Sequence, residues 1–274
     1  MRMLCAGLVL FFCSAAVGAT TPVDGWGRNI DVPPRPPERI AALSPHLAES
    51  LFALGHGAQV VATVAYADHP PGAQNVPRVG DAFTLSFEAL VAARPDWILV
   101  WGATLTPSRL RRLESLGAPV YVSEPRSLAD IARELAVLTD ILGGGGDLAQ
   151  DLRGRIDALS GISAAPTRQV LPLIASKPPL TLARDHFLTD VLAHCGAANP
   201  FATTAGPVVE LSRERLLTAE LDAVLNLSGA PLPSGILLPL GTVVLDMDPD
   251  LLVRPGPRVI EGAEALCAEL AGAL

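Results

Sequence analysis

The sequence lacks the residue patterns that catalysis requires. Its five histidines lie at unrelated positions, and we find neither a G-x-S-x-G elbow, a G-x-x-x-x-G-K-[S/T] loop nor an H-E-x-x-H pair. The glycines of 143–146 follow no predicted strand and lack the spacing of a G-x-G-x-x-G loop, so we interpret them as a linker turn. No nucleophile–base or acid–base constellation can be assembled. The sequence therefore argues against an enzyme.

The N-terminus has the pattern of a secretory signal. Arg2 provides a positive start, an apolar run extends from residue 4 to about residue 12, and small residues end at Ala19. The run is too short to span a bilayer, and no later stretch reaches about 18 uninterrupted apolar residues. We expect cleavage near Ala19 and a soluble mature chain outside the cytoplasm. Cys13 raises the alternative of lipidation, although the bulky residues 11–12 before it disfavour this.

The positions of the four cysteines predict one disulfide in the mature chain. Cys5 and Cys13 lie in the signal, which leaves Cys195 and Cys267 in an oxidising compartment, where we expect them to form a disulfide. The alternative is two buried free thiols, whereas no His or Cys stands at the spacing of a metal site.

Removing residues 1–19 takes away one charge, Arg2, so the net charge changes from −8 to −9 (−8 − 1). An acidic chain without basic clusters argues against nucleic acid and anionic membranes as partners.

Short strands alternate with helices in two blocks along the chain. This pattern is typical of mostly parallel sheets with helices on both faces. We predict an α/β fold of two lobes joined by one long rigid helix, with ligand bound in the cleft between the lobes. The expected segments are a signal (1–19), an extended Pro-rich lead-in (20–37), an N-terminal lobe (38–145), the interlobe helix (146–163) and a C-terminal lobe (164–274).

Several motifs cover nearly the whole mature chain. They are Leu43-Ser44-Pro45 with Glu49, Tyr66-Ala67-Asp68-His69-Pro70-Pro71, Val76 to Phe83, Leu85 to Leu90, Arg94 to Gly102, His186 to Gly196 with Asn199-Pro200-Phe201, Ser212-Arg213-Glu214, and Arg254 to Arg258 with Cys267. The chain thereby resembles the class III periplasmic binding proteins, the receptors that deliver metal chelates to ABC importers. Within that class it is most similar to the cobalamin binders.

The resemblance implies a set of ligand-binding residues. Tyr66 and Trp101 match aromatic positions of the first lobe that line the cleft, and aromatic faces suit a flat, partly apolar macrocycle. Phe83 lies near a third such position. Asp250 and Arg254 match positions near the cleft in the second lobe, although Asp250 would serve equally well as a helix cap.

The chain also departs from the cobalamin binders. Where those receptors carry further tryptophans, it has Ala82, Val208 and Leu251, so the cleft has fewer aromatic side chains. His46 and His69 are expected to be capping or solvated residues, not ligands. These differences concern the identity of the ligand and leave the predicted fold unchanged.

Glu88 and Glu214 match a pair of surface carboxylates, one per lobe, that dock such receptors onto the permease subunits in the inner membrane. Each lies early in a predicted helix, where a negative charge also stabilises the helix by about 0.3–1 kcal/mol. Both roles are compatible.

The resemblance implies a monomeric periplasmic receptor that transports cobalamin or a related corrinoid and needs no cofactor of its own. The alternative is haem or a ferric siderophore bound by the same architecture. Haem would require a Tyr or His pair that reaches the iron across the cleft, and only His186 is available as a partner for Tyr66.

Overall fold

The computed structural model describes residues 22–30, 35–81, 84–159, 167–183 and 186–273. The predicted signal (1–19) with Cys13, and the predicted ligand residue Phe83, lie outside these ranges.

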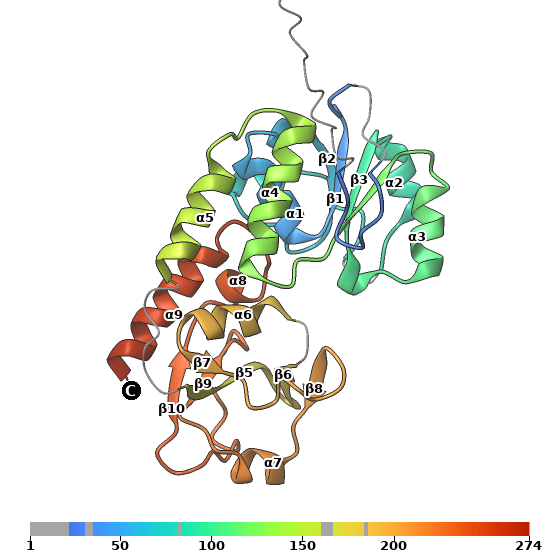
Figure 1. Cartoon of the computed structure of the whole chain (residues 1–274). Helices are drawn as coiled ribbons and strands as arrows, with labels where there is room; N and C mark the ends of the chain where they lie inside the picture. The colour runs from blue at the N-terminus through green and yellow to red at the C-terminus, as the bar shows by residue number, and fades with distance from the viewer. Residues whose placement is uncertain (1–21, 31–34, 82–83, 160–166, 184–185, 274) are drawn as a thin grey trace, which may run out of the picture.

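The N-terminal lobe is built on a parallel four-stranded sheet with the order β2-β1-β3-β4. Its strands are β1 (Ile40–Leu43), β2 (Val60–Thr63), β3 (Trp97–Trp101) and β4 (Val120–Ser123). Helices α2 (Phe87–Ala93) and α3 (Pro107–Glu114) cover one face, and α1 (Pro45–Ala53) and α4 (Leu128–Leu142) cover the other (Figure 1). Successive strand residues alternate between the two faces, since Ala41 and Ile98 pack in one apolar core and Ile40 and Leu99 in the other.

Local sequence sets the helix boundaries of this lobe. The Ser44 hydroxyl accepts a hydrogen bond from Leu47 N, and Pro45 occupies the first helical position of α1. Short 3-10 helices lie in the loops at Gly57–Gln59, Pro71–Asn75 and Gly102–Thr104.

The C-terminal lobe contains a second sheet with the order β10-β9-β5-β6-β8, and β7 also pairs with β5. Its strands are β5 (Arg168–Ser176), β6 (Pro179–Leu182), β7 (Ala197–Ala198), β8 (Val208–Glu210), β9 (Ala223–Asn226) and β10 (Val243–Asp246). The pairs β5–β7, β5–β9 and β9–β10 are parallel, whereas β6 is antiparallel to both β5 and β8. The sheet is therefore mostly parallel, as predicted. β6 must run antiparallel to β5, because residues 177–178 are too few for a crossover.

In the described part of this lobe, the helices are α6 (Phe187–His194), α7 (Arg213–Thr218), α8 (Pro249–Leu252) and α9 (Val259–Ala273). The predicted disulfide is present between Cys195, which directly follows α6, and Cys267 on α9. It therefore fixes the C-terminal helix to the body of the lobe.

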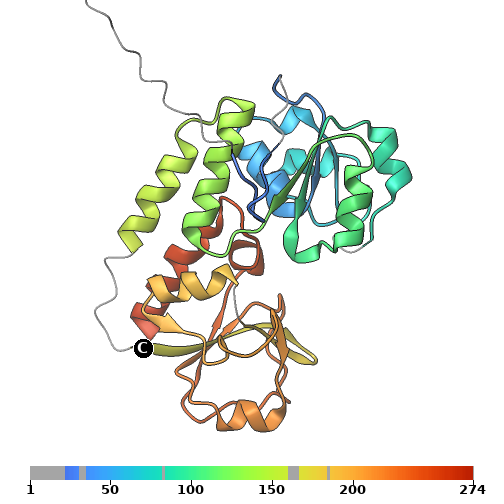
Figure 2. The ribbon, with the colours of Figure 1, turned by 45° about the vertical axis from the view of Figure 1, so that its right-hand side comes forward.

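The lobes are connected at the predicted interlobe helix, and other helices pack around it. The chain passes between them at α5 (Leu148–Leu159), which lies inside the predicted segment, and residues 160–163 lie outside the described ranges. Helix α5 packs against α4 and α9, and α6 also packs against α4 and α9; α4 and α5 lie side by side in both ribbon views (Figures 1 and 2). One apolar core accordingly extends from Leu47 on α1 through Leu152 on α5 to Leu266 on α9. The exact domain boundaries stay a prediction.

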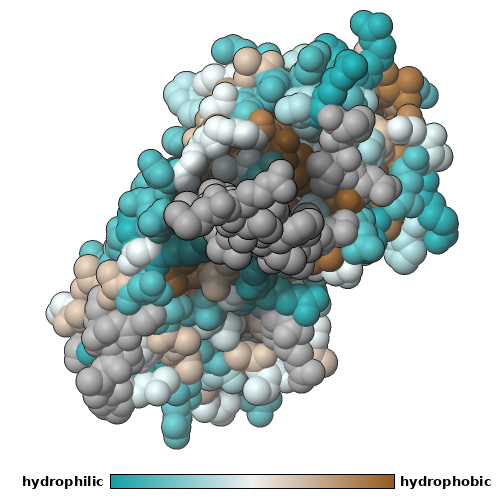
Figure 3. Space-filling view, turned by 45° about the horizontal axis from the view of Figure 1, so that its top comes forward, coloured by the Kyte–Doolittle hydropathy of each residue, from teal (hydrophilic) through white to brown (hydrophobic). Residues whose placement is uncertain are grey.

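Within the described residues, no helix combines the length and apolar character that crossing a bilayer requires. On the face seen in Figure 3, hydrophilic surface predominates, and apolar surface occurs in small areas, mainly on the upper lobe.

Candidate ligand site between the lobes

A cavity of about 320 Å³ lies between the two lobes. The N-terminal lobe contributes residues at or just after the carboxyl ends of β3 and β4, which is where parallel sheets commonly bind ligands. The C-terminal lobe contributes the start of α6 and the residues before β8. The lining residues are Trp101, Ala103, Glu124, Pro125, Arg126, His186, Phe187, Gly206 and Pro207.

Trp101 forms the aromatic wall of this cavity, and His46 supports it from behind. The two rings meet edge to face, with centroids 5.5 Å apart at an angle of 81°. His46 is buried, and its ring nitrogens hydrogen-bond the hydroxyls of Ser44 at 3.0 Å and Ser123 at 3.1 Å. Burial, assisted by the charge of Arg254, lowers its pKa to about 3. The expected solvated role of His46 is therefore wrong, and both of its nitrogens are occupied.

Tyr66 follows β2 and exposes 75% of its surface. Its φ of 66° lies in the left-handed region, which costs on the order of 1 kcal/mol for a side chain of this size. Tyr66 thus combines a solvent-exposed aromatic ring with an unfavourable backbone conformation. This combination is common where a side chain serves a ligand.

Asp250 and Arg254 form an ion pair, and Asp68 of the N-terminal lobe joins them. Arg254 pairs with Asp250 at 2.7 Å and, across the lobes, with Asp68 at 2.9 Å. Burial would raise the pKa of Asp68, but the hydrogen bond and charge of Arg254 hold it below its usual value. Burial raises the pKa of Asp250, and the nearby Asp68 adds to this. Asp248 also caps α8 through Asp250 N, so Asp250 is free of the capping role that we considered for it.

These polar residues do not share the Trp101 cavity directly. Among the described residues, its lining includes Trp101 but not Tyr66, Asp250 or Arg254. His46 lies between the Trp101 cavity and the Asp250–Arg254 pair. Its ring contacts Trp101, and the charge of Arg254 helps to lower its pKa. Next to Asp250, a further hollow of about 380 Å³ opens at the carboxyl ends of β9 and β10, with Asp248 and Asn226 in its lining.

His186 is the polar group of α6 at the cavity. Its Nδ1 accepts a hydrogen bond from Leu188 N at 3.2 Å and so caps the helix. Burial lowers the pKa of His186 to about 4, which leaves the ring neutral at neutral pH. With Nδ1 acting as acceptor, the proton of the neutral ring resides on Nε2. His186 is thus suited to donate a hydrogen bond into the cavity.

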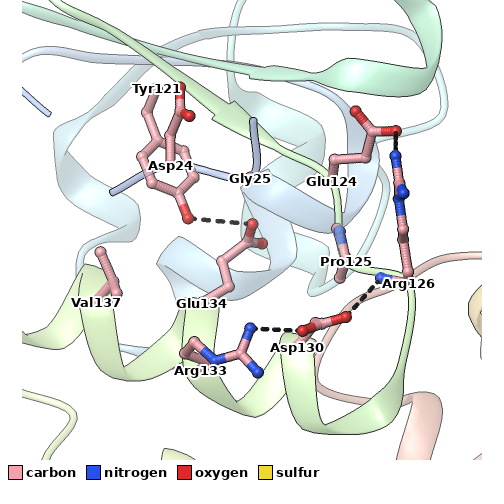
Figure 4. A pocket seen from close by; sticks show the side chains of 10 residues that line it. All are labelled: Asp24, Gly25, Tyr121, Glu124, Pro125, Arg126, Asp130, Arg133, Glu134 and Val137. Carbon is pink, nitrogen blue, oxygen red and sulfur yellow. Dashed lines mark hydrogen bonds and ion pairs between the residues drawn. The ribbon is translucent and has the colours of Figure 1, made fainter. Parts of the chain in front are cut away.

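A second cavity of about 320 Å³ lies within the N-terminal lobe and shares residues 124–126 with the first (Figure 4). Tyr121 donates to the buried carboxyl group of Glu134 at 3.3 Å. Desolvation raises the pKa of Glu134 to about 7. The rim carries the pairs Arg133–Asp130 and Arg126–Glu124. Its charged lining and its position inside one lobe make it a poor match for a large apolar ligand.

Glu88 and Glu214 occupy equivalent positions in two helices, one on each lobe. Each is the second residue of its helix, α2 or α7, and each helix is capped by a serine, Ser86 or Ser212. Both glutamates are exposed. In Figure 1 the two helices lie on different lobes, with α7 at the far end of the C-terminal lobe.

Comparison with known proteins gives a consistent result. The model of the periplasmic binding protein family matches residues 40–232. A vitamin B12-binding protein of Vibrio cholerae is 32% identical over 251 residues, which cover 86% of this chain and 90% of the relative. The crystal structure of the periplasmic vitamin B12 binding protein BtuF of Vibrio cholerae matches with a TM-score of 0.79 at 29% identity, over 87% of this chain and 98% of that one.

A haem binder shares the fold more distantly. The periplasmic heme-binding protein RhuT from Roseiflexus sp. RS-1 has a TM-score of 0.70 at 24% identity and covers 84% of this chain and 97% of its own. The family model matches more than half of the chain, and the Vibrio cholerae relative is 32% identical over most of both chains. The chain therefore belongs to the periplasmic binding protein family.

Proposed function

We propose that this protein binds cobalamin or a related corrinoid in the cleft between its lobes and delivers it to an ABC-type importer without changing it chemically. The observation that carries this proposal is the cavity walled by Trp101 on one lobe and by His186 on the other. The similarity to proteins named as vitamin B12-binding, over most of both chains, supports the same ligand.

The proposed contacts follow from the chemistry of the residues. Trp101 and the exposed Tyr66 offer aromatic faces to the corrin ring, and Phe83 is retained from the sequence as a third. Asp250, whose partner Arg254 is shared with Asp68, would accept hydrogen bonds from the amide side chains of the ligand. Arg254 would donate to their carbonyl oxygens. Cobalamin is cargo here, and we propose no cofactor or metal of the protein's own.

Delivery requires a docking surface, and we assign it to Glu88 and Glu214. One exposed glutamate on each lobe would let a permease dimer contact both lobes through arginines. Exposed carboxylates of this kind chiefly set orientation and association rate. We further propose that the protein acts in the periplasm as a monomer, after removal of residues 1–19.

Haem or a ferric siderophore is the alternative ligand class. Haem binding across the cleft would need His186 as the partner of Tyr66. Nδ1 of His186 accepts the Leu188 N–H, so iron binding through Nε2 would move the ring proton to Nδ1 and remove this helix cap. Corrinoid binding requires no such change. The similarity to proteins named as vitamin B12-binding favours the corrinoid.

Calorimetric titration of the purified protein with cyanocobalamin and with haemin tests the proposal. We expect cyanocobalamin to bind with a stoichiometry of one and more tightly than haemin. Tight binding of haemin with no binding of cyanocobalamin would replace the corrinoid by the alternative ligand.

A further inference from the structure

The lead-in forms an ordered turn that packs against the N-terminal lobe. Val23 and Asn29 form an antiparallel bridge, and Gly25 N donates to Val122 O at 2.7 Å, next to the end of β4. The buried carboxylate of Asp24 accepts hydrogen bonds from Trp26 N at 3.0 Å and Arg28 N at 2.9 Å. This turn was expected to be merely extended. It is instead fixed at the edge strand β4, and its tip carries Trp26.

Trp26 lies beside the lining of the interlobe cavity. Its indole Nε1 donates to the carboxylate of Glu124, which lines that cavity. The indole also lies against Gly102, the residue between the lining residues Trp101 and Ala103. Trp26 still exposes 37% of its surface, so part of its ring is open to solvent at this position.

Gly102 permits this close approach. A Cβ added at Gly102 would lie 2.7 Å from the indole nitrogen of Trp26 and would clash with the Glu124 carboxylate. Any side chain at position 102 would therefore displace the Trp26–Glu124 pair. The indole and the carboxylate occupy their places because the residue after Trp101 has no side chain.

We propose that Trp26 contacts the ligand, as a second aromatic wall at the rim of the cleft beside Trp101. The inference rests on the proposed function and extends it, because it assigns a role to the lead-in. The ligand class is a planar macrocycle whose edge extends beyond Trp101. The hydrogen bond to Glu124 fixes the orientation of the indole, which reduces the entropic cost of contact.

Two measurements with cyanocobalamin test this role. The first is calorimetric affinity for the wild type, Trp26→Ala, Trp26→Phe and Gly102→Ala, with Leu240→Ala as a control because Leu240 is fully exposed in the C-terminal lobe. We expect about tenfold weaker binding for Trp26→Ala and for Gly102→Ala, and less than about threefold for Trp26→Phe, which keeps an aromatic face. The control should bind like the wild type.

The second measurement is hydroxyl-radical footprinting of the wild-type protein, which does not depend on any variant folding. We expect saturating cyanocobalamin to protect Trp26 from oxidation while Leu240 is oxidised as before. Unchanged oxidation of Trp26, or unchanged affinity of Trp26→Ala, in a protein that does bind cyanocobalamin would overturn the inference and leave the proposed function standing. Absence of binding by the wild type would overturn both.

Discussion

Glu49 on α1 and Arg258, which directly precedes α9, form an ion pair of 2.8 Å that joins the two lobes. The Glu49 carboxylate is almost completely buried, and it also accepts the backbone N–H of Arg258 at 3.3 Å. A buried charge that loses its partner is strongly destabilising. This pair and the shared apolar core both connect the lobes.

Glu49→Ala should therefore lower the free energy of unfolding by about 3 kcal/mol, because it leaves Arg258 without its partner in a largely desolvated place. Urea unfolding followed by circular dichroism measures the change. Glu264→Ala is the matched control, since it removes the exposed pair of Glu264 with Arg155, and such pairs contribute about 0–1 kcal/mol. Equal effects of the two substitutions would show that the Glu49–Arg258 pair has no special structural role.

Trp101→Ala should weaken cyanocobalamin binding about 30-fold, or ~2 kcal/mol, because it removes the aromatic wall of the cavity. Calorimetry measures the dissociation constant, and thermal unfolding checks that the variant is folded. A His46→Ala variant should show a smaller loss, since His46 only supports the Trp101 ring from behind. If Trp101→Ala binds as tightly as the wild type, Trp101 is not a ligand contact.

Glu134→Gln should stabilise the protein at alkaline pH. The pKa of Glu134 is raised from 4.5 to about 7 in the folded state. Below pH 4.5 the carboxyl group is protonated in both the folded and the unfolded chain, so its burial carries no cost of charge. As the pH rises from 4.5 through 7, the unfolded chain ionises more easily than the folded one, and the unfolding free energy falls. The amide cannot ionise and keeps an oxygen for the Tyr121 hydroxyl, so at pH 8 the variant should be more stable by up to about 3 kcal/mol.

Denaturant unfolding at pH 4.5 and pH 8 checks this result. The two proteins should differ little at pH 4.5. A loss of stability at pH 8 would mean that the Glu134 carboxylate is stabilised in its charged form.

Replacing Cys195 and Cys267 with serine should lower the unfolding free energy by about 4 kcal/mol, because the disulfide closes a loop of 72 residues in the unfolded chain. Reduction of the wild-type protein should produce a similar loss. Ligand binding should persist at temperatures where the variant stays folded, since neither cysteine lines the interlobe cavity described above. A variant as stable as the wild type would contradict the loop-closure argument.

Glu88→Lys and Glu214→Lys should each impair delivery without impairing capture. Stimulation of the importer's ATPase in proteoliposomes should require about tenfold more receptor, because a charge of the wrong sign would face the permease arginines. The dissociation constant for cyanocobalamin should stay within about twofold of the wild type. Glu269→Lys, which alters an exposed carboxylate of α9, is the control and should behave as the wild type does.

Much of the fold follows from local sequence. The alternation of short strands with helices in two blocks predicted both α/β lobes and their mostly parallel sheets. Strands β6 and β8 were not expected, because their short segments carry no alternation that distinguishes them from loop. Their pairing is set by the sheet that they join.

The site was less predictable, because its contacts are distant in sequence. From the sequence, His46 was expected to be a capping or solvated residue beside Ser44. In the structure it is buried, and its Nε2 is hydrogen-bonded to the hydroxyl of Ser123, which lies 77 residues away. The partner of Glu49 lies 209 residues away. No local pattern indicates either contact. The disulfide could be expected from the compartment and the cysteine count alone.

The central claim is that a corrinoid lies between the lobes against Trp101. The crystal structure of the complex with cyanocobalamin tests it most directly. We predict that the corrin ring occupies the interlobe cavity, with Trp101 on one side and the start of α6 on the other. Density for the ligand elsewhere, such as the cavity of Tyr121 and Glu134, with the interlobe cavity empty, would contradict the account.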